Sequence, residues 1–342
     1  MTWENEYPEG HSVEENVHVQ RFPTDRPRDL KRFNRLSRDI TFDIESTTTQ
    51  MQETWMREQG PLSSALLQYV EKHRFRYDAF FFFGYLYATT YYALPLVEEK
   101  AFLIPLAHDE WPIRMRIWDR LFARPLSMIF NTPEERDFVQ GRFPDLPIEG
   151  PIIGIGIDEA PAASKDAFRQ FYDIDGPFVL YLGRIDASKG CAALIEDFQR
   201  YRQQHPTPKL LVMIGDKHMA VPADDNIIVL GPVDDGMKWN ALRACQLLVM
   251  PSPHESLSLA VLEAWASERA VLVSASSSIL IGQCRRAQGG LWYANYEEFE
   301  AALRLLTPQL CDRLGRQGKD FVEITYRWPA VEELYRSLLK GP

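Results

Sequence analysis

Short apolar runs alternate with amphipathic segments through the second half of the chain, and no other feature constrains the fold as strongly. The apolar runs, each predicted to be a strand, are residues 178–186, 209–216, 226–231, 246–252 and 270–275. The amphipathic segments, each predicted to be a helix, are residues 191–205, 235–245, 256–268 and 296–306. Strands that are apolar throughout are typical of a sheet covered on both faces. The alternation therefore predicts an α/β fold with a parallel, doubly wound sheet.

The first half of the chain shows the same pattern more weakly. Its predicted strands are residues 77–86, 101–108 and 126–132, and its predicted helices are residues 65–73, 89–100 and 113–125. A stretch rich in Pro and Gly, residues 143–164, interrupts both patterns and is the best candidate for a domain boundary. We therefore expect one α/β domain over residues 1–150 and a second over residues 151–325. The amphipathic segment 326–342 is expected to form a helix that packs back on the first domain.

Composition excludes several classes of protein. The net charge of −10 argues against a protein that binds nucleic acid. The four cysteines are scattered without metal-ligand spacing, and the polar first residues do not resemble a signal peptide, so we expect a cytoplasmic protein with reduced thiols. Residues 79–97 carry no charge and are long enough to span a bilayer. Because they contain Gly84 and Pro95 and lack basic flanks, a buried strand followed by a short helix is the preferred interpretation.

Two short motifs resemble ligand sites but have simpler interpretations. Residues 154–158, GIGID, begin like a dinucleotide fingerprint, but the third glycine is absent and the segment lies at the expected boundary. Residues 173–175, DID, resemble paired metal-binding aspartates, but Gly176 and Pro177 follow, which is typical of a turn. We expect neither a bound cofactor nor a metal ion.

The segment 181–190, YLGRIDASKG, is a stronger candidate for a ligand site. The predicted strand ends at Gly183, where the backbone can approach a ligand closely, and Arg184 and Lys189 precede the next helix. Ligands bind beyond the carboxyl ends of the strands in an open parallel sheet, and an arginine and a lysine there suit a diphosphate. The alternative is a solvated loop in which Arg184 forms an ion pair with Asp186.

The segment 251–268, PSPHESLSLAVLEAWASE, carries two glutamates with seven residues between them. A helix is expected to begin near Ser256 or Ser258, so Glu255 would lie just outside it and Glu263 about two turns inside. The backbone N–H groups expected to form an anion site are those of Ser256, Leu257 and Ser258. The two glutamates would accept hydrogen bonds from sugar hydroxyls, and the N–H groups between them would bind phosphate. The segment would then form a nucleotide-sugar site. The alternative is that Glu255 caps the helix and Glu263 is an ordinary surface residue.

Together these motifs carry a family resemblance. GRIDASKG, VMIGD, VLGPVDDG, LLVMPSPHESLSLAVLEAWA and GGLWY occur in the order typical of the C-terminal domain of family 4 glycosyltransferases. Glu255 and Glu263 match the E-x₇-E motif of that family. In the first half, QGPLSSALLQYV, YDAFFFFGYLY, LIPLAHDEWP and IFNTPEERDFV resemble its acceptor domain, and YRWPAVEELY is similar to its terminal helix. The resemblance implies the GT-B fold, in which two Rossmann-like domains face each other across a cleft, and a retaining sugar transferase.

The resemblance also implies roles for individual residues. Arg184 and Lys189 would hold the donor diphosphate and stabilise its leaving-group charge. Glu263 would bind the ribose hydroxyls and Glu255 the transferred sugar. His108 aligns with a histidine that contacts the donor sugar, although on spacing alone a single histidine after an apolar strand is more often structural. The donor-binding residues that the resemblance implies are Gly183, Arg184, Lys189, Gly215, Val233, Glu255, Ser256, Leu257, Ser258 and Glu263.

No carboxylate is clearly placed to attack the sugar, which favours front-face substitution, without metal or cofactor, over double displacement. The function implied is transfer of a hexose from a GDP- or UDP-linked donor to a glycan or lipid-linked acceptor. The alternative is a non-catalytic protein that binds nucleotide sugars and partners an intact transferase. An epimerase on the same fold is a weaker third interpretation. Members of the family usually begin with an apolar strand and a glycine-rich loop before a segment like TWENEYPEG, so the first domain is expected to be incomplete.

Two segments are rich in basic residues. Residues 21–39 contain seven of them, and residues 113–125 contain four arginines. They could bind a phosphate-bearing acceptor or make peripheral contact with anionic lipid at the inner membrane face. The preferred alternative is that they are solvated helix faces paired with the interspersed aspartates.

Overall fold

The computed structural model describes residues 2–206 and 209–340, and the chain forms two compact units, Met1–Ile152 (unit 1) and Ile153–Pro342 (unit 2). The division falls within the stretch 143–164 that is rich in Pro and Gly. Met1, the first residue of the predicted first domain, lies outside the described residues. So do residues 341–342, the last two of the predicted terminal segment.

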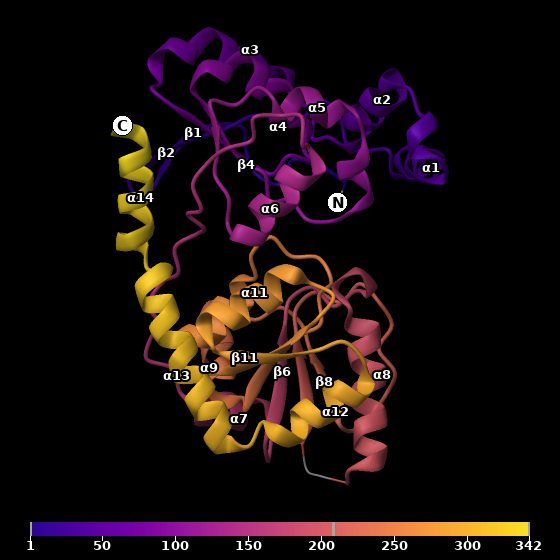
Figure 1. Ribbon diagram of the computed structural model, residues 1–342, viewed down its shortest axis with the longest axis vertical. Coiled ribbons are helices and arrows are strands. Elements are labelled where there is room, and N and C mark those ends of the chain that lie inside the picture. Colours follow the sequence, from indigo (N-terminus) through magenta and orange to yellow (C-terminus); the bar gives the residue numbers. More distant parts are fainter. Residues whose placement is uncertain (1, 207–208, 341–342) are drawn as a thin grey trace. The chain divides into compact units, whose positions relative to one another are not determined.

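Unit 1 contains a parallel sheet and a separate hairpin (Figure 1). Its elements are β1 Gly10–Glu14, β2 Val17–Arg21, α1 Leu30–Phe42, α2 Thr49–Gln59, α3 Ser64–His73, β3 Phe80–Phe83, α4 Ala88–Ala93, β4 Ala101–Ile104, α5 Ile117–Phe122, β5 Ser127–Met128 and α6 Pro133–Arg142. Strands β3, β4 and β5 pair in parallel in that order, and β1 pairs with β2 through a tight turn at Glu15 and Asn16, both with positive φ. The hairpin was not predicted, because its strands are mostly polar and exposed.

The uncharged stretch 79–97 forms strand β3 and the short helix α4, in agreement with the preferred interpretation. Gly84 lies between them with φ +80°, where a residue with a side chain would be strained. Of the helices in the described part of the chain, none is both long and apolar enough to cross a bilayer.

Unit 2 alternates strands and helices as the sequence predicts. Its elements are α7 Lys165–Tyr172, β6 Phe178–Leu182, α8 Cys191–Gln204, β7 Leu210–Ile214, β8 Ile227–Leu230, α9 Asp235–Ala244, β9 Leu247–Met250, α10 Leu259–Ala266, β10 Ala270–Ser274, α11 Ser278–Ala287, β11 Gly290–Tyr293, α12 Tyr296–Leu305, α13 Pro308–Thr325 and α14 Trp328–Lys340. The predicted strands and helices all appear, each within four residues of its expected ends. Four elements were not predicted: α7, α11, β11 and α13.

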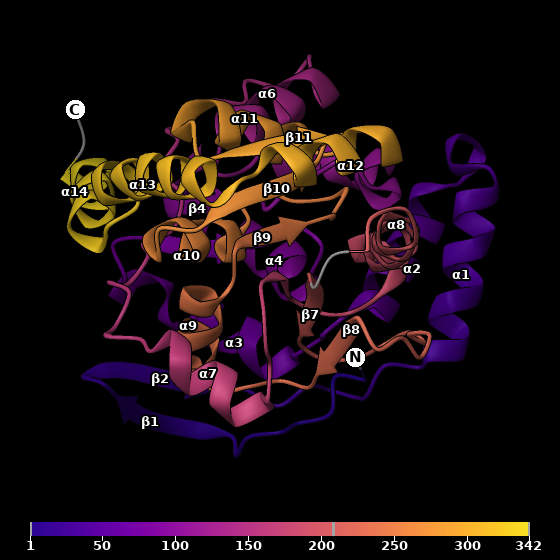
Figure 2. The same cartoon turned by 90° about the horizontal axis from the view of Figure 1, so that it is seen from below.

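The six strands of unit 2 pair in parallel in the order β11-β10-β9-β6-β7-β8. The chain runs from β6 toward one edge through α8, and from β9 toward the other edge through α10. Because such crossovers are right-handed, helices on the two halves cover opposite faces. Figure 2 shows this arrangement, with α8 on one face of the sheet and α9 and α10 on the other. The direction therefore reverses between β6 and β9, which is the topological switch point of the sheet.

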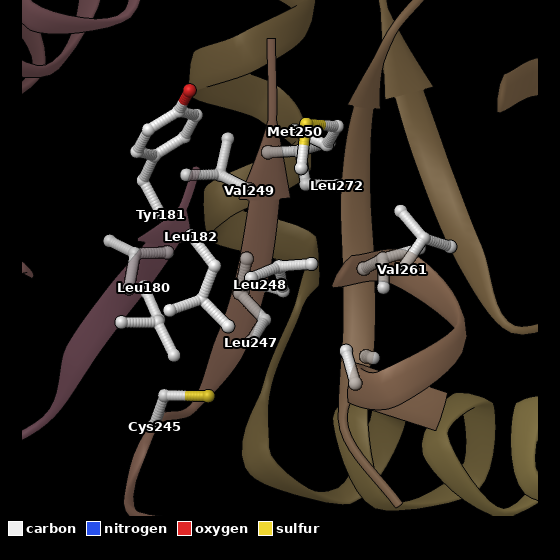
Figure 3. Close-up of a cluster of buried hydrophobic side chains, with 14 of the residues drawn as sticks. Leu180, Tyr181, Leu182, Cys245, Leu247, Leu248, Val249, Met250, Val261 and Leu272 are labelled. Carbon is white, nitrogen blue, oxygen red and sulfur yellow. The ribbon is translucent and has the colours of Figure 1, made fainter. Parts of the chain in front are cut away.

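The core of unit 2 lies on both faces of this sheet. Strands β6, β9 and β10 are buried at every position, as expected for inner parallel strands. Figure 3 shows their side chains, including Leu180, Leu248 and Leu272, together with Val261 from α10. With its strands fixed by packing on both faces, the sheet holds its loops at defined positions.

Candidate functional site

A pocket of about 370 Å³ opens at the carboxyl ends of β6 and β7 in unit 2. It is lined by Leu182, Gly183, Arg184, Ile214, Gly215, Asp216, Pro232, Val233, Lys238, Ala260 and Glu263. The residues come from the ends of β6 and β7, the loop after β8, and helices α9 and α10. This is the place beside the switch point where an open α/β sheet binds its ligands. Five of the predicted site residues, Gly183, Arg184, Gly215, Val233 and Glu263, therefore line one pocket.

Two glycines allow the loops after β6 and β7 to lie against each other. Gly183 and Gly215 both have φ +141°, and a Cβ on Gly215 would lie 2.0 Å from the carbonyl oxygen of Gly183. The N–H of Ile185 donates to the carbonyl of Asp216 at 2.8 Å, which extends the pairing of the two strands into the loops. A side chain at position 215 would separate these loops and change the pocket floor.

Arg184 forms an ion pair with Asp186, as the alternative interpretation of this loop predicted. Asp186 also accepts hydrogen bonds from the hydroxyl of Ser188 at 2.6 Å and the N–H of Lys189 at 3.2 Å. Burial alone would raise the pKa of the Asp186 carboxyl, but the hydrogen bonds from Ser188 and Arg184 outweigh it and lower that pKa. The ion pair does not remove Arg184 from the pocket, since Arg184 lines it and is half exposed.

Lys189 and Glu255 come together at the end of β9. The Nζ of Lys189 lies 2.9 Å from Oε1 of Glu255, whose side chain is only 11% exposed. Gly190 makes this possible: with φ +76°, it approaches the carbonyl oxygen of Pro251 so closely that a Cβ would lie 2.3 Å from that oxygen. The sequence placed both side chains at a ligand site but did not predict that they pair with each other.

Helix α10 begins at Leu259, with Ser258 as its N-cap residue, and the Ser258 side chain makes no capping bond. The prediction that the helix begins near Ser256 or Ser258 was therefore right only for the cap position, and Glu263 lies just over one turn inside rather than two. The N–H groups of the first turn belong to residues 259–261 and not to residues 256–258. Residues 251–258 form a loop between β9 and α10. Glu255 does not cap it.

Glu263 is also not an ordinary surface residue. Its Oε1 lies 2.8 Å from Nζ of Lys238 in α9, and its side chain is 19% exposed. Partial burial alone would lower the pKa of Lys238, but its hydrogen bonds to Glu263 and Asp235 outweigh it and raise that pKa. Lys238 and Asp216 line the pocket and were missed by the sequence analysis. Two motifs offered a signal in the sequence: VMIGD ends at Asp216, and VLGPVDDG ends two residues before Lys238.

The three residues between Glu255 and the helix differ in accessibility. The side chains of Leu257 and Ser258 are buried, at 8% and 3% exposure, and Leu257 belongs to the core cluster of unit 2. Ser256 is partly buried. For Leu257, only the backbone is left to contact a ligand.

His108 lies in unit 1, four residues after the end of β4. Its Nε2 is 3.6 Å from Oε1 of Glu110, and the hydroxyl of Tyr85 donates to the same oxygen at 3.2 Å. Its side chain is 26% exposed, so one part of the ring is open to solvent.

The basic segments of unit 1 are paired only in part. Arg26 and Arg32 both contact Glu58, Arg114 contacts Asp109, and Arg124 contacts Glu98. Most of the partners are glutamates from other segments, not the interspersed aspartates that were predicted. Asp25 and Asp29 instead accept hydrogen bonds from backbone N–H groups. Across residues 2–206 and 209–340, no three His, Cys, Asp or Glu side chains gather as a metal-binding group.

Comparison with known proteins agrees with the family resemblance. Residues 176–307 match the family model of Glycosyl transferases group 1. The matched segment runs from just before β6 to the end of α12, so it includes every residue that lines the pocket. The resemblance to glycosyltransferases found in the sequence is thereby confirmed.

One sequence relative matches about half of the chain, and solved structures extend the similarity in fold to all of it. Mannosylfructose-phosphate synthase of Agrobacterium fabrum (strain C58 / ATCC 33970) is 23% identical over 201 residues, which cover 52% of this chain and 44% of the relative. The match therefore spans less than half the length of that relative. Sucrose-phosphate synthase from Thermosynechococcus elongatus has a similar structure (TM-score 0.72, 16% identity) over 100% of this chain and 88% of its own. A trehalose-6-phosphate protein from E. coli bound with UDP-2-fluoro glucose is also similar (TM-score 0.72, 12% identity, 100% and 91% covered). The fold is GT-B, as predicted.

Proposed function

We propose that the chain is a retaining glycosyltransferase that uses a UDP-linked hexose as its donor. The observation that carries the proposal is the pocket in unit 2, where five residues implied by the resemblance meet at the switch point of the sheet. A pocket of about 370 Å³ lies within the range typical of small-molecule sites. The E. coli relative was bound with UDP-2-fluoro glucose, which supports uridine over guanosine as the donor base.

The charges around the pocket suit a diphosphate leaving group. Arg184 lines the pocket, Lys189 follows it in the loop after β6, and the first turn of α10 adds N–H groups that favour an anion. Each cation has a carboxylate partner, Asp186 for Arg184 and Glu255 for Lys189. We propose that a bound diphosphate takes over both cations and that Glu255 then accepts a hydroxyl of the sugar. Cations placed where charge develops lower the barrier to transfer.

A panel of nucleotide sugars tests this function. We expect UDP release from at least one UDP-hexose, with GDP-sugars at least tenfold less efficient, and a product that keeps the anomeric configuration of the donor by proton NMR. Turnover should persist in EDTA, because the proposed charge stabilisation comes from side chains. Calorimetric titration with UDP is the parallel binding measurement. If UDP binds but no donor turns over with any acceptor, the chain is a nucleotide-sugar-binding protein instead.

We propose further that the acceptor is a lipid-linked glycan, reached at the cytoplasmic face of a membrane. The outer face of α1 supports this, because Lys31, Arg35, Arg38 and Phe42 follow one another at helical spacing along it. All four are exposed, Phe42 at 93%. Within residues 2–206 and 209–340 none of the three basic side chains has an ion-pair partner, unlike Arg32 on the adjacent face. Unpaired basic residues beside an exposed aromatic ring suit an anionic bilayer surface.

Vesicle binding tests this membrane contact. The triple variant Lys31→Glu, Arg35→Glu, Arg38→Glu should bind vesicles containing 30 mol% anionic lipid at least tenfold more weakly than the unchanged chain in a sedimentation assay, since each basic residue near such a surface contributes about 1 kcal/mol. The matched control reverses the charge of three exposed basic residues of unit 2 in the same way, by Lys165→Glu, Arg313→Glu and Arg316→Glu. Equal binding by both variants, or transfer only to soluble phosphorylated sugars, would contradict a lipid-linked acceptor.

A further inference from the structure

One buried carboxylate in unit 1 holds together the ends of two strands. Glu135 lies in the first turn of α6 and is completely buried. Its Oε1 accepts a hydrogen bond from the N–H of Ala107 at 2.7 Å, and its Oε2 accepts one from the N–H of Asn131 at 2.7 Å. Ala107 follows β4 and Asn131 follows β5, so a single side chain bridges the carboxyl ends of neighbouring parallel strands.

This arrangement exceeds what capping of α6 requires. Thr132 is the N-cap residue and accepts from the N–H of Glu135 at 3.1 Å, so the sequence T-x-x-E is typical of a capping box. A capping box needs only bonds within the first turn, whereas the oxygens of Glu135 bond the residue before the cap and a loop from another strand. Burial raises the pKa of Glu135 to about 7, against the hydrogen bonds from Asn131 and Ala107. Among the described residues it has no cationic partner, so backbone N–H groups alone compensate its burial.

The loop that Glu135 holds is strained and carries His108. Leu106 has φ +55°, a conformation that a branched residue rarely adopts. Such conformations persist where the surroundings fix them, and they concentrate at functional sites. Ala107, which donates to Glu135, stands directly between Leu106 and His108. The bond from Ala107 therefore fixes the backbone that precedes the histidine.

The His108 ring is held separately, through its side chain. Glu110 Oε1 lies near His108 Nε2 and accepts from the hydroxyl of Tyr85, which is 1% exposed. Burial, followed by the charge of Glu110, raises the pKa of this tyrosine well above its ordinary value, so Tyr85 remains a donor. The backbone and the ring of His108 thus have different supports, and each can be altered alone.

We infer that Glu135 is a positioning residue, which by bridging the ends of β4 and β5 fixes the backbone of His108 for sugar transfer. The inference rests on the proposed function, with His108 in contact with the donor sugar as the family resemblance implies. Glu135 is buried and does not touch a substrate, so it acts only through the loop. Its loss should therefore affect turnover more than nucleotide binding, which belongs to unit 2.

A double-mutant cycle tests the inference. Glu135→Gln keeps the size of the side chain but offers one acceptor oxygen where two are needed, and we expect kcat to fall at least tenfold while the Kd for UDP changes less than twofold. In a His108→Ala background the same substitution should lower kcat by less than twofold, because the residue acts through His108. Glu58→Gln is the matched control, since Glu58 is a buried glutamate of unit 1 at 4% exposure. Its effect on kcat should be small and additive with His108→Ala.

A second readout does not depend on turnover. Long-range ¹H–¹⁵N spectra of the histidine rings should show the His108 signals displaced by Glu135→Gln and unmoved by Glu58→Gln. Unchanged His108 signals, or equal losses of kcat with and without His108, would overturn the positioning role while the transferase function stands. If the wild type turns over no donor, the proposed function fails, and transfer cannot be what the fixed His108 serves.

Discussion

Replacing Glu255 by glutamine is expected to lower kcat/KM for sugar transfer by about 10²-fold to 10³-fold, the size of loss seen when one charge-stabilising group is removed from an active site. The Glu255 carboxylate is 11% exposed and pairs with Lys189, so glutamine removes one of its two acceptor oxygens and the charge that orients the lysine. Affinity for UDP should change less than threefold, since the proposed contact is with the sugar. Initial rates over a range of donor concentrations, with calorimetry for UDP, measure both quantities.

Glu268→Gln is the matched control for this variant. Glu268 pairs with Lys319 at 2.7 Å in the same unit, but it follows the carboxyl end of α10, whereas Glu255 precedes the start of that helix. The pair lowers the pKa of Glu268, chiefly through the hydrogen bond from Lys319, so the substitution removes a comparable interaction. Its kcat/KM should stay within twofold of wild type. Full activity in Glu255→Gln, or an equal loss in both variants, would remove Glu255 from the site.

Replacing Trp265 by alanine should lower the free energy of unfolding of unit 2 by about 3–5 kcal/mol, as large-to-small changes of buried tryptophans do. Trp265 is completely buried in α10, and its Nε1 donates to the carbonyl of Gly289 at 3.0 Å. A Cβ on Gly318 of α13 would lie 2.1 Å from its ring, so the ring fills the space between the helices. Urea unfolding followed by circular dichroism, with and without UDP to mark the unit 2 transition, measures the loss.

Trp292→Ala provides the comparison for this stability change. Trp292 lies on β11 and is 38% exposed, so its truncation should cost less than about 1.5 kcal/mol. A loss in Trp265→Ala no larger than that in Trp292→Ala would show that α10 and α13 can close the cavity by moving together. In that case the contact at Gly318 would not define their spacing.

The sequence predicted best those features that depend on local composition. Buried strands such as β6 and β9 are continuous apolar runs, so they were found within a few residues, and Gly183 and Arg184 were placed correctly at a strand end. Helix α13 was missed because Gly315 and Gly318, which allow close packing, also weaken the helical pattern. Strand β11 was missed because it is short and only partly buried.

The features that the sequence could not reveal arise between distant segments. Lys238 reaches Glu263 from a neighbouring helix, and nothing in either local pattern links the two. Glu135 resembles a simple helix cap in the sequence, because its partner Ala107 lies in the loop after another strand. The sequence did not decide between Ser256 and Ser258 as the N-cap of α10, since both are good caps, and the choice of Ser258 depends on how the loop packs.

The parallel sheet of unit 2 also determines when the pocket can exist during folding. No two neighbouring strands in it are joined by a hairpin, and the central pairing of β6 with β9 brings together residues 179–180 and 247–248. Pairings between residues far apart in the sequence form slowly, because closing the long loop between them costs entropy before any contact stabilises it. The pocket needs both halves of the sheet, so a partly assembled chain offers the nucleotide nothing to bind. A ligand would then stabilise the folded unit by binding to it, but it would not speed up folding.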